Sequence, residues 1–118
     1  MVEYRFEPDR NLLVVTVTGT VTDEAFQDDK FPDVPPGTLE LLDLDGATDV
    51  KISNAEVRRV AAVDTRRPER IVRMAILAQR DVGFGLARMY QTLTSEMSTE
   101  VQVFRSRDEA LAWLGVDD

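Results

Sequence analysis

The chain begins with a regular alternation of apolar and polar residues, which is the pattern of a strand with one buried face. Val2, Tyr4 and Phe6 alternate with charged residues, and a second apolar run, rich in β-branched residues, covers 12–18. A Pro-Asp-Arg-Asn segment lies between the two runs and is typical of a tight turn. We therefore predict a β-hairpin whose second strand ends at Gly19.

The next segments predict a short helix and a third strand. Thr22 is a suitable helix cap, acidic residues follow it in the first turn, and Phe26 falls on the buried side. Prolines and a glycine within 32–37 end that helix. The apolar run 39–44 predicts a strand in the middle of the sheet, and the acidic segment 45–49 predicts a turn at its carboxyl end.

A second helix is predicted to begin at a capping box formed by Ser53 and Glu56. In this motif the serine hydroxyl accepts a hydrogen bond from the later amide, and the glutamate side chain reaches back to the serine amide. Val57 and Ala61 fall on one face of the helix, and Pro68 ends it.

The second half of the chain continues to alternate strands and helices. A nearly continuous apolar run over 71–78 predicts a central parallel strand that is covered on both faces. Apolar residues, beginning with Val82, then recur at spacings of three and four, which predicts a helix over 81–97 with one buried stripe. A last strand over 101–104 and a helix capped by Ser106 follow.

The predicted order is therefore β-β-α-β-α-β-α-β-α in a single domain that spans 1–118. Alternating strands and helices imply parallel strands joined by right-handed crossovers. The hairpin adds its first strand in the opposite direction. We thus expect an α/β fold with a mostly parallel five-stranded sheet whose first strand is antiparallel.

Composition limits the class of protein. The chain has 118 residues and a hydrophobic fraction of 43%, which fits one domain with a real core. No apolar run reaches the roughly 20 residues of a membrane-spanning helix, and the first residues lack the apolar centre of a signal peptide. Because the sequence has no cysteine, we expect no disulfides and a location in the reducing cytoplasm.

Charge and missing residue types limit the chemistry. Without histidine or cysteine, the usual zinc sites and the serine and cysteine nucleophile systems are excluded, and we predict no cofactor and no metal. The net charge of −8 disfavours nucleic acids and anionic membranes. The charge is uneven, since 1–56 carries a net −9 and 57–118 a net +1, and such a field can orient a protein partner or a second copy of the chain.

Three stretches together resemble one family of domains. They are 42–48 (LDLDGAT), 83–91 (GFGLARMYQ) and 103–114 (VFRSRDEALAWL). With the predicted order of strands and helices, they resemble the STAS domain, specifically its SpoIIAA-like (STAS/SEC14-like) bacterial branch. The resemblance implies the α/β fold of that family and a non-catalytic role in binding other proteins, including kinases or other regulators.

The resemblance also points to one candidate regulatory residue. In anti-sigma-factor antagonists of the STAS family, an Asp-Ser-Ser-Gly segment opens the helix after the third strand, and a partner kinase phosphorylates its second serine. That segment aligns with 51–54, so Ser53 matches the phosphoacceptor, while Lys51 and Asn54 replace the aspartate and the glycine. The residues alone leave two roles open for Ser53, a phosphorylated switch and a plain helix cap.

The candidate partner surface surrounds Ser53 at the carboxyl end of the third strand, an edge where ligands and partners of α/β sheets usually bind. Its members are Asp45, Thr48, Asp49, Lys51, Asn54 and Arg58. A second set of charges could face an acidic protein or the acidic half of another copy. That set consists of Arg58, Arg59, Arg66, Arg67, Arg70 and Arg73.

Two local motifs suggest alternatives. Asp43-Leu44-Asp45-Gly46 resembles the nucleophile motif of haloacid-dehalogenase-type phosphatases, which use magnesium, although Ala47 stands where that motif has threonine or valine. Gly83 and Gly85 follow a predicted strand, where they serve either close packing at a helix start or contact with an anion or small ligand.

The remaining alternative is a small lipophilic ligand, because SEC14-like relatives hold such molecules. We expect no lipid cavity, however, since the chain has no spare helices to line one. The sequence therefore favours a non-catalytic interaction module that is regulated at the edge formed by 43–56. A lipophilic-ligand binder and a magnesium-dependent phosphatase that uses Asp43 and Asp45 are the alternatives, in that order.

Overall fold

The computed structural model describes residues 1–27, 31–66 and 70–117 of the chain. Its centre is a five-stranded sheet in the order β1-β2-β3-β4-β5. The strands are β1 (Val2–Glu7), β2 (Leu12–Thr22), β3 (Thr38–Lys51), β4 (Ile71–Leu77) and β5 (Glu100–Phe104). β1 is antiparallel to β2 and the other neighbours are parallel, which confirms the predicted sheet.

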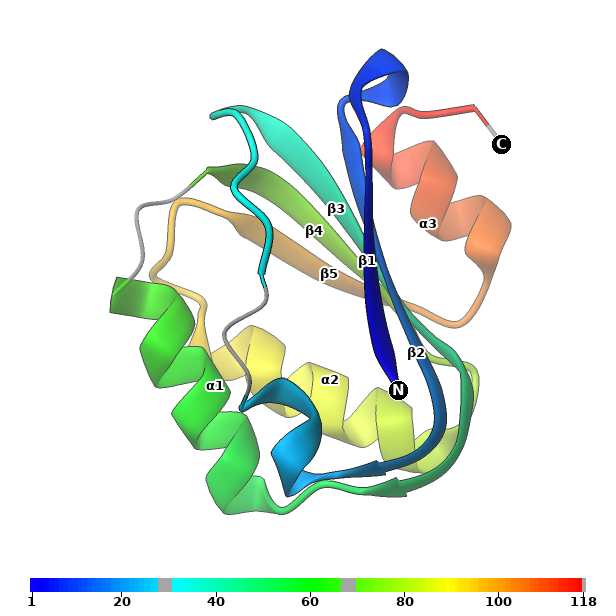
Figure 1. Ribbon diagram of the computed structural model, residues 1–118, viewed down its shortest axis with the longest axis vertical. Helices are drawn as coiled ribbons and strands as arrows, with labels where there is room; N and C mark the ends of the chain where they lie inside the picture. Colours follow the sequence, from blue (N-terminus) through cyan, green and yellow to red (C-terminus); the bar gives the residue numbers. More distant parts are fainter. Residues whose placement is uncertain (28–30, 67–69, 118) are drawn as a thin grey trace.

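Helices cover both faces of this sheet (Figure 1). The α-helices of the described residues are α1 (Asn54–Arg66), α2 (Asp81–Leu93) and α3 (Arg107–Leu114), and two short 3₁₀ turns are η1 (Pro8–Arg10) and η2 (Asp23–Phe26). Figure 1 shows α1 and α2 on one side of the sheet and α3 on the other. Within the described ranges, no helix is long and apolar enough to cross a membrane.

The face under α3 is a well-filled core. Alternate residues of β2, β3 and β4 point to it, because side chains alternate between the faces of a strand. The buried members are Leu12, Val14, Leu41, Ala75, Leu77, Ala110, Leu111 and Leu114. The amide of Glu109 donates to the hydroxyl of Ser106 at 3.4 Å, so the predicted cap of this helix is confirmed.

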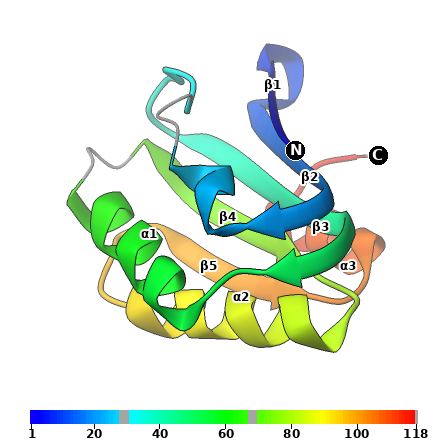
Figure 2. The same cartoon turned by 60° about the horizontal axis from the view of Figure 1, so that its bottom comes forward.

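The opposite face lies under α1 and α2. Buried residues from four elements meet there, namely Val57, Ala61, Met74, Ile76, Ala87, Tyr90 and Val101. Figure 2 shows α1 and α2 side by side below the sheet, and α1 packs mainly against α2 rather than against the strands. This placement leaves space between α1 and the sheet.

β2 and β3 continue together past the end of β4 as a curved ribbon, formed by 17–22 and 46–51. The acidic segment 45–49, predicted as a turn, is therefore part of a strand, and β2 runs on beyond Gly19. Two register shifts bend the ribbon, and Gly19 has a φ of 73° at one of them. As Figure 2 shows, the bend carries the end of β3 to the start of α1.

Two helix predictions need correction. The helix expected at Thr22 is only the 3₁₀ turn η2, and the Thr22 hydroxyl donates to the carboxylate of Glu24 at 2.7 Å instead of capping the turn. α2 ends at Leu93 instead of Met97, and Val82, predicted on its buried stripe, is 61% exposed. The predicted helix end at Pro68 lies outside the described residues.

Candidate functional site

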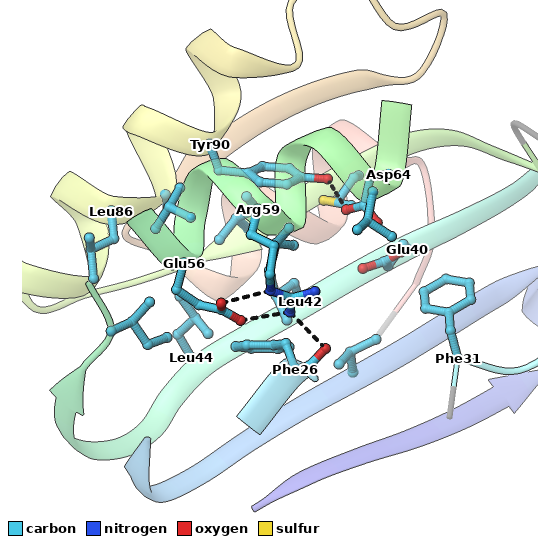
Figure 3. Close-up of a pocket in the computed structure, with 18 of the residues that line it drawn as sticks. Phe26, Phe31, Glu40, Leu42, Leu44, Glu56, Arg59, Asp64, Leu86 and Tyr90 are labelled. Atoms are coloured by element: carbon cyan, nitrogen blue, oxygen red, sulfur yellow. Dashed lines mark hydrogen bonds and ion pairs between the residues drawn. The ribbon is translucent and has the colours of Figure 1, made fainter. Parts of the chain in front are cut away.

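A cavity of about 420 Å³ lies between the sheet and the elements α1, α2 and η2 (Figure 3), and we call it the interior cavity. Most of its wall is apolar. The apolar lining is Val15, Phe26, Phe31, Leu42, Leu44, Ile52, Val57, Val60, Val63, Ile71, Met74, Ile76, Leu86, Ala87 and Met97. The expectation that the chain has no means to line such a cavity is therefore wrong.

The cavity lies where the side chains of α1 leave part of the sheet uncovered. Leu42, Leu44 and Val60 lie inside the fold, yet each is only half-buried. They line the cavity, so part of their apolar surface meets empty space instead of another side chain. The short side chain of Ala87 on α2 also leaves the space open.

Glu40 of β3 is the unusual member of this wall. Side chains at 40, 42 and 44 share the face toward α1, so the carboxyl group of Glu40 points into the apolar region (Figure 3). The residue is 3% exposed, and its Oε1 atom has no hydrogen-bond partner among the described residues. Burial, and secondly the nearby Asp64, raise the pKa of Glu40 to about 8. At neutral pH the group is therefore an uncharged carboxylic acid.

Asp64 and Tyr90 add a polar pair to the same wall. The hydroxyl of Tyr90 on α2 donates to Oδ2 of Asp64 on α1 at 2.6 Å, and Figure 3 shows this pair beside Glu40. The pair links the two helices at the level of the buried acid.

Glu56 and Arg59 form the other polar part of the wall. Nε and Nη2 of Arg59 each donate to one carboxylate oxygen of Glu56 at 2.7 Å. Arg59 Nη2 also donates to the carbonyl of Phe26 at 3.3 Å, which ties α1 to η2 (Figure 3). The hydrogen bonds to Glu56 raise the pKa of Arg59 above its ordinary value.

Ser53 caps α1 and also binds the carboxylate of Asp23. Its Oγ atom accepts from the amide of Glu56 at 3.1 Å, as predicted, but the Glu56 side chain turns to Arg59 instead of completing the capping box. The Ser53 amide and hydroxyl each donate to Asp23 of η2 at 2.8 Å. These two bonds lower the pKa of Asp23. A phosphate on Ser53 would thus lie directly beside a carboxylate.

The predicted partner surface divides into two parts. Lys51, Asn54 and Arg58 are exposed around the start of α1, together with Ser53. Asp45, Thr48, Asp49 and Gly83 instead line a second depression of about 320 Å³ between the end of β3 and the start of α2. Asp49 and Lys51 form an exposed ion pair at 3.4 Å that connects the two parts.

The two aspartates of the phosphatase-like motif are held by the protein itself. Asp43 pairs with Arg107 of α3 at 3.3 Å, and its other oxygen accepts from the amide of Asp45 at 2.9 Å. Asp45 accepts two bonds of 3.2 Å from Gln79. Among the residues that the structure describes, no three acidic side chains are grouped so that they could hold a metal ion.

The glycine motif lies at the start of α2, where the predicted helix over 81–97 places it. α2 begins at Asp81, so Gly83 and Gly85 lie within its first two turns. A Cβ atom added to Gly83 would be 3.7 Å from Ala78 and 4.0 Å from Leu44, which is ordinary packing, and Gly85 faces open space. The geometry therefore gives no steric reason for a glycine at position 83 or at position 85.

The predicted arginine set is dispersed. Arg59 belongs to the cavity wall, whereas Arg73 donates to the carbonyl of Trp113 on the α3 side at 3.1 Å. Arg70 donates to the carbonyl of Val34 at 3.1 Å. Arg58, also of the predicted arginine set, lies on α1 and is exposed. Arg67 and the side chain of Arg66 lie outside the described part of the chain.

Glu40 is the functional candidate that sequence reasoning missed. The signal was present, because Glu40 interrupts an apolar run that was predicted to lie in the middle of the sheet. A charged residue at such a position is almost never buried unless it is paired or has a function. Several other acidic residues follow Glu40 closely in the chain, so a single glutamate within the strand did not stand out.

Comparisons with known proteins agree with this architecture. No curated protein matches the chain. Among solved structures, the chain is similar to an uncharacterized protein with a SpoIIAA-like fold from Shewanella loihica PV-4, with a TM-score of 0.60 and 18% identity over 97% of this chain and 92% of that chain. At this identity the likeness concerns the fold alone. A model of the SpoIIAA-like family matches residues 12–115. The chain therefore belongs to the SpoIIAA-like family.

Proposed function

We propose that this domain is a non-catalytic binding module that takes up a small apolar molecule in its interior cavity. The observation that carries the proposal is the cavity itself. Its volume of about 420 Å³ falls in the range of small-molecule sites, and its lining combines many apolar side chains with a few polar groups.

The construction of the wall supports this role. η2 closes one side of the cavity with Phe26, and Ala25 and Phe26 also pack against an apolar cluster on the ribbon of β2 and β3. On the side of α1, η2 is held by polar bonds from Ser53 to Asp23 and from Arg59 to the Phe26 carbonyl. Bonds of this kind, largely exposed to water, open at little cost compared with a buried apolar contact. A ligand could therefore enter past η2 without disturbing the sheet.

The test is binding of an apolar fluorescent dye, Nile red, followed by its displacement with decanol. Blocking variants Ala87→Phe and Val60→Phe place a ring in the cavity, and Ala62→Phe adds the same ring on the exposed side of α1. We expect dye binding in the wild type and in the Ala62→Phe protein, with a loss of at least tenfold in the blocked proteins. Two blocking sites are used so that a folding defect in one does not decide the result.

Native mass spectrometry of the protein isolated from its own host, without detergent, adds an independent measurement. We expect a bound small molecule in the wild type that is missing from both blocked variants. A protein that is free of cargo and binds neither dye nor decanol would refute the proposal.

A second candidate function is protein–protein interaction at the surface around Ser53, in keeping with the interaction role that is general among STAS domains. The observation that supports this candidate is an exposed edge of the molecule that includes Thr48, Asp49, Lys51 and Asn54. We propose that a regulator, a kinase or a second copy of the chain binds this edge in the cytoplasm, and that phosphorylation of Ser53 would weaken the binding.

Photo-cross-linking tests this candidate. A cross-linking amino acid at Thr48 or Asn54 should give one product of reproducible mass in the host, whereas the same group at the exposed Glu109 on α3 should give none. Phosphopeptide mapping of Ser53 in growth and in starvation tests the regulation separately. Equal products from all three positions would contradict a specific surface, and absence of phosphate in both conditions would leave Ser53 a helix cap.

A further inference from the structure

The outer edge of β1 presents backbone groups to which no described strand binds. β1 lies at the end of the sheet, and among the described strands only β2 pairs with it. Met1 donates to the Thr18 carbonyl at 2.6 Å, and the Thr18 amide donates to the Met1 carbonyl at 2.8 Å. In an antiparallel pair such residues alternate with residues whose N–H and C=O groups point away, so those of Val2 and Phe6 point outward. Figure 1 shows β1 in front of the other strands, with no other ribbon drawn over it.

An edge of this kind is a template for a further strand. We propose that β1 pairs antiparallel with β1 of a second copy of the chain, around a two-fold axis at Tyr4, so that the two sheets join into one. A two-fold interface must be self-complementary, because each residue that meets a second residue is met by its counterpart on the other side of the axis. The inference does not depend on the interior cavity or on the surface around Ser53.

The charges of β1 select one register for this pairing. Positions 2, 4 and 6 point outward and must meet outward positions of the other copy, so three registers pair at least two of them in each copy. In the first, Glu3 faces Glu3, and in the second, Arg5 faces Arg5 and Glu3 faces Glu7. In the third, which is the longest and is centred on Tyr4, Glu3 of each copy faces Arg5 of the other. Like charges directly opposite one another are destabilising and opposite charges are stabilising, which favours the third register.

Arg5 is placed to bind a second carboxylate. Its Nε and Nη2 atoms bind one oxygen of Glu7 at 2.8 and 2.7 Å, and among the described residues its Nη1 atom makes no hydrogen bond or ion pair. The side chain of Arg5 is 68% exposed, and Glu3 is exposed on the same face of β1. Glu3 of a second copy would therefore meet a guanidinium group that Glu7 already orients.

The same register joins the apolar sides of the two strands. Val2 and Phe6 are half-buried, and they pack against a buried cluster that consists of Leu13, Val15 and Val34. In the proposed pairing Val2 of each copy lies beside Phe6 of the other, and the two Tyr4 residues meet at the axis. The surface of these side chains that is exposed in one copy is then covered, which favours association. The charged face and the apolar face of β1 thus select the same register.

The first experiment is sedimentation velocity over a range of protein concentrations, at about 0.15 M salt to screen the net charge of −8 on each copy. Because one short strand of each copy forms the contact, we expect a dimer that dissociates on dilution into the low micromolar range. Glu3→Arg and Arg5→Glu each place like charges opposite one another, so each should weaken association at least tenfold. An equimolar mixture of the two variants should associate again, since arginines then face glutamates. Arg58→Glu, the same charge change on the exposed side of α1, should leave the dimer intact.

Disulfide trapping tests the register with neutral variants, and the chain has no cysteine of its own to interfere. Facing residues of the 3–5 type have Cα atoms about 4.5 Å apart, which suits a disulfide. Under mild oxidation, a mixture of Glu3→Cys and Arg5→Cys should cross-link at least tenfold faster than either variant alone. Faster cross-linking of either variant with itself would indicate another register and overturn the proposal. A wild-type protein that is monomeric at every concentration, or a dimer that both charge reversals preserve, would also overturn it.

Discussion

The hydroxyl of Ser53 donates a hydrogen bond of 2.8 Å to Asp23, a residue 30 positions earlier in the chain. The Ser53 amide donates to the other oxygen of the same carboxylate at 2.8 Å. Asp23 belongs to η2, at the end of the curved ribbon, and Ser53 caps α1. A residue that the family resemblance presents as a phosphoacceptor is thus already bound to a negative charge.

This contact predicts how a charge at position 53 is tolerated. Asparagine and aspartate are equally good helix caps, and the helix dipole alone would favour aspartate. The carboxylate of Asp23 lies against residue 53 and would repel a second carboxylate there. We therefore expect Ser53→Asp to unfold at a lower urea concentration than Ser53→Asn. In an Asp23→Asn background the order should reverse, since only the favourable dipole is left. If Ser53→Asp were the more stable protein with Asp23 present, the carboxylate would have to move aside, and a phosphate could be accommodated in the same way.

The buried acid Glu40 predicts an unusual pH dependence of stability. Its pKa is about 8 in the folded protein, against an ordinary value of 4.5, mainly because of burial. Between these values the folded chain holds a proton that the unfolded chain has lost, so the free energy of unfolding falls as pH rises. The slope from this group is about 1.4 kcal/mol per pH unit and ends near pH 8. The chain has no histidine, so no imidazole titrates in this window.

Urea unfolding at pH 5, 6, 7 and 8 checks this prediction, with Glu40→Gln as the comparison. The glutamine variant cannot ionise, so we expect a flatter profile and the largest relative gain in stability at pH 8. Parallel profiles for the two proteins would mean that Glu40 is already ionised in the folded state.

The fold could be predicted from sequence because its signals are local. The alternation at Val2, Tyr4 and Phe6 and the apolar run over 71–78 each report the burial of neighbouring residues on one strand. The caps Ser53 and Ser106 mark helix starts by the chemistry of a single side chain, and both are confirmed. The parallel sheet then follows from the order of the elements.

The cavity could not be predicted because it depends on the distance between elements. No local pattern reports that α1 packs on α2 and stands away from the strands, since the apolar residues of its inner face would look the same in a filled core. The curved ribbon was missed for a related reason. Asp45 and Asp49 are typical turn residues, but pairing of β3 with β2 keeps them in a strand. Long-range pairing overrode the local preference.

Substitution of a glycine by alanine should have opposite effects at Gly46, in the bend of that ribbon, and at Gly85, in α2. A Cβ atom at Gly46 would lie 2.9 Å from the Thr18 methyl group and 3.2 Å from the carbonyl of Val17, so the strands would have to separate. We expect Gly46→Ala to lower the free energy of unfolding by about 1 to 3 kcal/mol. Gly85 faces open space within α2, so Gly85→Ala should raise it by about 0.5 to 1 kcal/mol. Urea unfolding measures both, and equal effects of the same sign would show that the bend is not constrained at Gly46.

The Glu56–Arg59 pair predicts a strong coupling between two residues of the cavity wall. Glu56 is 5% exposed, whereas the side chain of Arg59 is 41% exposed. Removing the arginine therefore leaves a buried carboxylate without its cation, while water still reaches the site and reduces the cost. We expect Arg59→Met to lower the free energy of unfolding by about 2 kcal/mol, less than the loss for a fully buried pair.

A double-mutant cycle with Glu56→Gln measures this coupling. In the Glu56→Gln background no charge is stranded, so Arg59→Met should cost much less, and the two substitutions should be non-additive by about 1 kcal/mol. The bond from Arg59 to the Phe26 carbonyl is lost in either background, so hydrogen exchange at the amide of Gln27, which caps the end of η2, should accelerate in both. Additive energies with unchanged exchange would show that the pair neither neutralises a buried charge nor holds η2, and the bonds between Ser53 and Asp23 would then be the polar contacts that hold η2 to the start of α1.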